Sequence, residues 1–107
     1  MKIVYVNGMV INFDKMATVK AIDLCGSFAI TAVEPDGTSN IFLRDLPSEE
    51  YATELLLVLM RLLSNRKTDV VIIDESDLKN AMEKVELTLE EKEKKKLESF
   101  YAELGVE

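Results

Sequence analysis

The chain has 107 residues, of which 48% are hydrophobic, and it contains four glycines and two prolines. This length and composition fit one folded domain rather than a disordered chain. A single cysteine excludes an internal disulfide framework, and the lack of histidine removes the commonest general base and metal ligand. The longest apolar run, Leu55–Met60, is too short to span a membrane and no signal peptide opens the sequence, so we expect a soluble, cytoplasmic protein.

The formal net charge of −7 is concentrated towards the C-terminus. Residues 69–107 hold six basic and twelve acidic residues, whereas residues 1–47 hold four basic and five acidic ones. Binding to a phosphate backbone needs clustered Lys and Arg, so we expect neither nucleic acid nor a membrane as partner. A basic protein surface is the natural electrostatic match, although the same charge also serves to keep a small domain soluble.

Residues 1–47 predict a run of short antiparallel strands. Asn7-Gly8 is the strongest short hairpin signal, because a type I′ turn needs two positive φ angles. That turn places Val6 opposite Met9 and Val4 opposite Ile11, which gives the hairpin one apolar face. The expected strands are Lys2–Val6, Met9–Phe13, Thr18–Leu24, Phe28–Val33 and Ser39–Leu43.

A helix is expected to begin after Ser48, whose hydroxyl can cap it. Glu49 and Glu50 then lie in the first turn, where the helix dipole favours anions. The apolar residues cover more than one side of this helix, so it should contact the sheet and either the C-terminal helix or a partner subunit. They are Leu55, Leu56, Leu57, Val58, Leu59, Met60, Leu62 and Leu63.

The last third predicts a strand at Val70–Ile73, where four β-branched residues run together. Ser76-Asp77 predicts a short helix through about Val85. Thr88-Leu89-Glu90-Glu91 is a capping box that predicts a second, longer helix ending near Gly105. The sequence leaves open whether the strand joins the main sheet and whether the last helix docks on the first one.

These elements predict an α+β fold in one domain, 1–107. An antiparallel five-stranded β-meander (1–47) packs on one long helix (48–66), and an acidic strand and helical segment (69–107) follows.

The sequence contains few candidates for a catalytic, metal-binding or phosphate-binding site. Cys25 has no histidine to activate it, and a small hydrophobic role is the favoured interpretation. Asp69, Asp74, Glu75 and Asp77 form the densest carboxylate cluster, but they lack the alternating Asp and central Gly of a calcium loop. The four glycines lie singly, so no loop is built to bind phosphate. We therefore expect no catalytic residue, no metal and no cofactor.

The first half of the chain has a characteristic order and spacing of strands and turns. It consists of Met1–Gly8, Val10–Asp14, the Asp36-Gly37 turn and the Ser48-Glu49-Glu50 helix start. In this order and spacing, residues 1–65 resemble small β-meander-plus-helix proteins, some of them pleckstrin-homology-like, that are common in Gram-positive bacteria and their phages. The resemblance implies a binding function rather than catalysis, and it includes no site motif.

The first functional hypothesis is a non-enzymatic protein-binding module whose acidic C-terminal third meets a basic protein surface. One concrete version is a phage or mobile-element inhibitor that occupies the nucleic-acid-binding surface of a host defence protein, with carboxylates in place of phosphates. The expected partner-binding residues are Asp69, Asp74, Glu75, Asp77, Glu83 and Glu86.

The alternative is a structural homo-oligomer, such as a homodimer, that associates through the Val70–Ile73 edge or the wide helix stripe. Exposed apolar stripes would favour association if the C-terminal helix does not fold back on the first helix. A carboxylate-based enzyme or small-ligand binder is the third reading and has no positive signal in the sequence. The residues expected at an oligomer contact are Leu57, Met60, Val71, Ile73, Phe100 and Tyr101.

Overall fold

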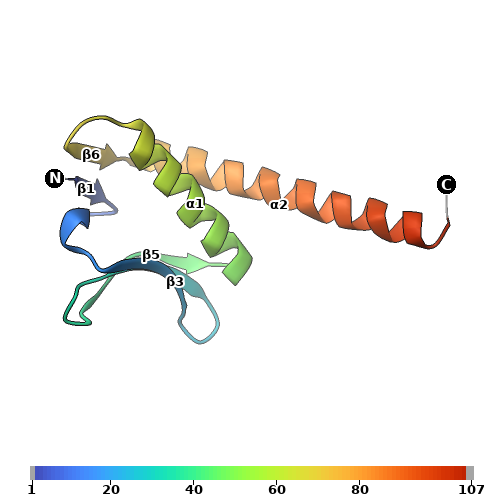
Figure 1. The fold of residues 1–107 in the computed structure, drawn as a ribbon, viewed down its shortest axis with the longest axis horizontal. Helices are drawn as coiled ribbons and strands as arrows, with labels where there is room; N and C mark the ends of the chain where they lie inside the picture. Colours follow the sequence, from blue (N-terminus) through green and yellow to red (C-terminus); the bar gives the residue numbers. More distant parts are fainter. Residues whose placement is uncertain (1, 106–107) are drawn as a thin grey trace.

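A computed structural model describes residues 2–105 as an α+β fold with two helices and two three-stranded sheets (Figure 1). A short 3₁₀ turn, η1, follows the first hairpin. In chain order the elements are β1 (Ile3–Val6), β2 (Met9–Asn12), η1 (Phe13–Lys15), β3 (Thr18–Asp23), β4 (Phe28–Val33), β5 (Ser39–Leu46), α1 (Glu49–Asn65), β6 (Val70–Ile73) and α2 (Glu75–Glu103).

The strands do not form the expected single five-stranded meander on one helix, and that prediction is wrong. One sheet has the order β2-β1-β6, and the other has the order β3-β4-β5. Two features explain why the strands form two separate sheets. The η1 turn ends the first hairpin before β3 can pair with it, and β6 takes the free edge of β1, where it pairs in parallel. The last strand therefore joins the sheet of the N-terminal hairpin and does not stand apart from it.

The first hairpin forms as the sequence predicts. Asn7 and Gly8 have φ angles of 50° and 78°, the two positive values that a type I′ turn needs. Val6 pairs with Met9 and Val4 with Ile11, in the predicted register. Val4, Val6 and Ile11 are buried, so this face of the hairpin contributes to the core.

Helix α1 lies at the centre of the molecule. The Ser48 hydroxyl accepts a hydrogen bond from the Tyr51 amide at 3.1 Å, as expected of an N-cap. One side of the helix buries Leu55 and Leu59 against β3, β4 and β5, and another side packs against α2 (Figure 1). The broad apolar surface of α1 is thus explained within the chain by a sheet on one side and a helix on the other.

The C-terminal segment forms one helix of 29 residues instead of the two that were expected. Its N-cap is Asp74, whose carboxylate accepts from the Asp77 amide, so the cap lies two residues before the predicted one. Thr88 does not open a new helix, because its hydroxyl donates to the Lys84 carbonyl at 2.9 Å within the helical turn. Gly105 has a φ of 70° and stands just beyond the helix end, as predicted.

The buried residues of α2 all lie in its first half. Ala81 and Val85 are buried against the core, whereas every residue from Glu90 to Gly105 is exposed. The last turns project beyond the N-terminal end of α1 and give the molecule extents of 54 × 31 × 21 Å (Figure 1). Helix α2 therefore docks on α1 with its first half, and the contact ends near the Lys92–Glu54 ion pair, beyond which the helix projects.

Two leucines on α1 provide a matched test of this core. Leu55→Ala should lower the free energy of unfolding by about 2–5 kcal/mol, because the side chain is 0% exposed and its loss leaves a cavity. Leu57→Ala makes the same chemical change at a side chain that is 45% exposed, and we expect a loss below about 1 kcal/mol. Urea unfolding measures both; equal losses would contradict the placement of α1.

Candidate functional site

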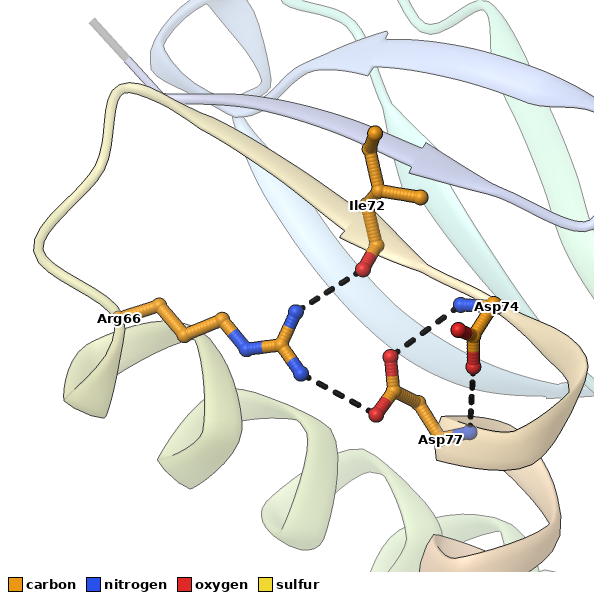
Figure 2. A network of polar contacts seen from close by, with 4 residues as sticks. All are labelled: Arg66, Ile72, Asp74 and Asp77. Carbon is orange, nitrogen blue, oxygen red and sulfur yellow. Dashed lines mark hydrogen bonds and ion pairs between the residues drawn. The ribbon is translucent and has the colours of Figure 1, made fainter.

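Arg66, the first residue after α1, joins three elements (Figure 2). Its Nη1 donates to the Ile72 carbonyl on β6 at 2.9 Å, and its Nη2 pairs with Asp77 Oδ1 on α2 at 3.1 Å. The other carboxylate oxygen of Asp77 accepts from the Asp74 amide at 3.3 Å, and the Asp77 amide donates to Asp74 Oδ1 at 2.8 Å. The end of α1, β6 and the start of α2 are thereby fixed to one another.

This network gives Asp74 and Asp77 structural roles, although both were expected to bind a partner. Asp74 caps α2 and Asp77 completes the capping box while it neutralises Arg66. Beside them, a groove of about 460 Å³ between α1 and α2 is lined by Arg61, Arg66 and Lys84 as well as Asp77. The surface around Asp77 is therefore rich in cations rather than acidic.

Three of the remaining expected residues do lie together on α2. A shallow groove of about 440 Å³ runs along the helix, and its lining is Glu75, Leu78, Lys79, Met82, Glu83 and Glu86. At 100° per residue, Glu90 and Glu93 fall on the same side of the helix one and two turns further on. We call Glu75, Glu83, Glu86, Glu90 and Glu93 the acidic α2 face. Asp69 is exposed in the loop before β6 and is not among them.

The acidic α2 face reaches the start of α1 at Tyr51. Burial raises the pKa of the Tyr51 phenol, and the negative charge of Glu86 raises it further. At the same end of the helix pair, Lys92 binds the Glu54 carboxylate, and this hydrogen bond raises the pKa of Lys92. Beside this ion pair, Glu50 of α1 and Lys96 of α2 line a common groove near the start of α1.

The fold places some of the residues expected at an oligomer contact in the core and others on the surface. Val71 and Ile73 are buried in the core, and Met60 packs partly against it. Leu57, Phe100 and Tyr101 are exposed, the last two in an edge-to-face ring contact with centroids 6.1 Å apart. On β6 the exposed side chains are instead Val70 and Ile72, which the alternation of a strand could have identified once its inner face was known.

The open edge of β6 is partly occupied by the chain itself. In the parallel ladder, the backbone groups of Val70 and Ile72 point away from β1. The Val70 carbonyl accepts from Thr68 Oγ1 at 2.9 Å, and the Ile72 carbonyl accepts from Arg66 Nη1. A strand from another chain would have to displace both side chains, so the edge is protected against strand pairing.

Comparison with known proteins adds no relative. No protein-family model matches the chain, and no curated protein or solved structure does so either. Among residues 2–105, no group of three or more Asp, Glu or Cys side chains is placed to hold a metal ion, and Cys25 is exposed in the turn after β3. No helix in that range is long and apolar enough to cross a membrane. The resemblance to small phage and Gram-positive proteins stays a prediction.

Asp77→Ala tests whether this carboxylate is structural. It removes the acceptor for the Asp74 amide and the partner of Arg66, so the free energy of unfolding should fall by about 1–2 kcal/mol, discounted for the partial exposure of the ion pair. Asp69→Ala, the same change at an exposed residue, should stay within about 0.5 kcal/mol of the wild type. Denaturant unfolding distinguishes the two, and an unaffected Asp77→Ala protein would contradict the structural role.

The raised pKa of Tyr51 predicts how stability depends on alkaline pH. Tyrosine in the unfolded chain ionises near pH 10, whereas the folded protein keeps Tyr51 neutral to higher pH, so this group favours unfolding increasingly as the pH rises above about 10. In Tyr51→Phe the alkaline fall in unfolding free energy should be smaller than in the wild type. Urea titrations at neutral pH and near pH 10.5 provide the comparison; identical falls would refute it.

Proposed function

We propose that the protein is a non-enzymatic protein-binding module that binds a basic protein surface through the acidic α2 face. The observation that supports this most is the groove on α2, whose lining combines Glu75, Glu83 and Glu86 with the apolar Leu78 and Met82 and a single cation, Lys79. Carboxylates beside apolar side chains suit a partner segment that carries Lys or Arg beside one or two apolar side chains. Glu90 and Glu93 extend the charge along the same side of the helix.

In its most specific form, the proposal is that the protein inhibits a nucleic-acid-binding protein, such as a host defence protein encountered by a phage or mobile element. A row of carboxylates on one helix side would take the positions of phosphates in the partner's basic groove. Inhibition of this kind predicts that nucleic acid and this protein exclude each other on the partner. Simultaneous binding of both would refute the inhibitor form while leaving the binding module intact.

A charge-matched pair of variants tests the acidic α2 face. Glu83→Gln with Glu86→Gln neutralises the face, and Glu91→Gln with Glu98→Gln removes the same charge from another side of the same helix. A partner captured by the immobilised wild type at low salt should be retained by the second variant and lost by the first. It should also be lost at roughly 0.5 M salt, because screening then acts within a few ångströms.

Two outcomes would overturn the proposal. Capture that survives neutralisation of Glu83 and Glu86 at low salt would show that the groove is not the contact. Equal loss in both variants would show attraction to total charge rather than to this face. Urea unfolding of both variants, expected to match the wild type because all four side chains are exposed, excludes misfolding as the cause.

A further inference from the structure

The outward side of the β2-β1-β6 sheet is apolar and uncovered. Its pairing places Val10, Tyr5 and Ile72 in one row across the three strands, and Asn12, Ile3 and Val70 in the next. None of these six residues is charged. We call the apolar members with large exposure the open sheet face: Tyr5 (44% exposed), Val10 (70%), Val70 (56%) and Ile72 (58%).

The strands that carry this face have the pattern of strands covered on both sides. The sequence of β1 is IVYV and that of β6 is VVII, apolar at inward and outward positions alike. The two strands pair in parallel, and parallel strands in proteins are normally covered on both faces, usually by helices. Here the inward residues lie in the core and the outward ones face solvent. One layer of the usual arrangement is missing from the single chain.

The same chain carries a helical surface that covers nothing. Leu97, Phe100, Tyr101 and Leu104 recur at helical spacing in the last turns of α2 and are 51–60% exposed. We call these four residues the terminal stripe. On the helix they lie about 130° away from the side that buries Ala81 and Val85, so the stripe does not continue the contact with the core.

The terminal stripe cannot cover the open sheet face of its own chain. Helix α2 begins directly after Asp74, one residue beyond β6, and runs without interruption to Glu103. Leu97 therefore lies about 33 Å along the helix from its start. Figure 1 shows the sheet and the C-terminal end of α2 at opposite ends of the long axis.

We propose that two copies of this chain form a reciprocal dimer in which the terminal stripe of each packs on the open sheet face of the other. About half of each side chain is exposed on both surfaces, so one stripe-on-sheet contact buries roughly 800 Å² in total, which is the size of a lattice contact. Two such contacts bury roughly 1,600 Å², which is the usual size of a stable interface. The area therefore favours a closed pair.

Two features of α2 disfavour the pairing of two terminal stripes with each other: the shortness of the stripe and the glutamates that precede it on the same side of the helix. The stripe spans two helical turns, far fewer than the several heptads that a coiled coil needs. Towards the N-terminus, the same side of the helix carries Glu86, Glu90 and Glu93, and a parallel pair would bring these like charges together. Packing of a helix on an uncovered sheet has no such penalty.

The proposal is independent of the acidic α2 face, since neither surface of the dimer contains a charged residue. Phe100→Glu disables the terminal stripe and Val10→Glu disables the open sheet face, both at exposed side chains that leave the core unchanged. Each variant alone should be monomeric in sedimentation velocity at high micromolar concentration, where the wild type is dimeric. Leu57→Glu, at an exposed leucine outside both surfaces, should remain dimeric and serves as the control.

The decisive sample is the equimolar mixture of the two disabled variants. It restores one intact contact, between the stripe of Val10→Glu and the sheet of Phe100→Glu, and a 1:1 dimer should reappear at higher concentration than the wild type needs. The disabled contact opposes two glutamates, so no new ion pair can mimic the result. All these measurements are made at roughly 0.5 M salt, where an apolar interface persists and an attraction between surface charges is lost.

Each outcome decides the proposal. A wild type that stays monomeric at high micromolar concentration overturns it, and leaves the acidic α2 face untouched as a site for a basic partner. Dimers that persist in both single variants show that the contact lies elsewhere, and dimers that persist in only one of them show a symmetric contact of like surfaces; either result contradicts the reciprocal arrangement. Variants that are monomeric alone and also monomeric when mixed at the highest soluble concentration would show that no stripe-on-sheet contact forms between them, which contradicts the reciprocal arrangement.

Discussion

Residues Val70–Ile73 return to the N-terminal hairpin and pair in parallel with β1, and this pairing determines where both helices can lie. Arg66 holds the end of α1 against β6 and the start of α2, so the direction of α2 is set within a few residues of the strand. Since α2 has 29 residues and α1 has 17, an antiparallel pair that starts at this end must leave the last turns of α2 without a partner. The projecting helix is thus a consequence of the strand pairing.

The same arrangement separates two kinds of surface along one helix. The side of α2 that carries the acidic α2 face becomes apolar from Leu97 onwards, where the terminal stripe begins. These surfaces suit different interactions: a salt-dependent contact with basic groups and a salt-independent contact with another apolar face. A basic partner on one and a second copy on the other are therefore compatible.

Local signals in the sequence predicted the local structure well. The Asn7-Gly8 turn, the register of its hairpin, the Ser48 cap and the Gly105 helix end all depend on residues close in sequence. The single five-stranded meander was wrong because β3 does not pair with β2. The sequence leaves the place of β6 open because its pairing with β1 joins residues about 67 positions apart, which no local pattern specifies. The helix start predicted at Thr88 was wrong because a hydroxyl inside a helix can bond to the carbonyl four residues earlier as readily as it can cap a new helix. Asp77 appeared free for a partner because only the fold brings Arg66 to it, and Asp74 because the sequence pattern predicts the helix cap at Ser76-Asp77.

The central claim is that the uncovered sheet and the free end of α2 are one interface shared between two copies. Hydrogen–deuterium exchange of the wild type at low and high protein concentration tests it directly. We expect the protection of residues 97–104 and of residues 70–73 to rise together with concentration, while residues 75–89 stay unchanged. Protection that rises in only one of the two segments, or in neither, would contradict the claim.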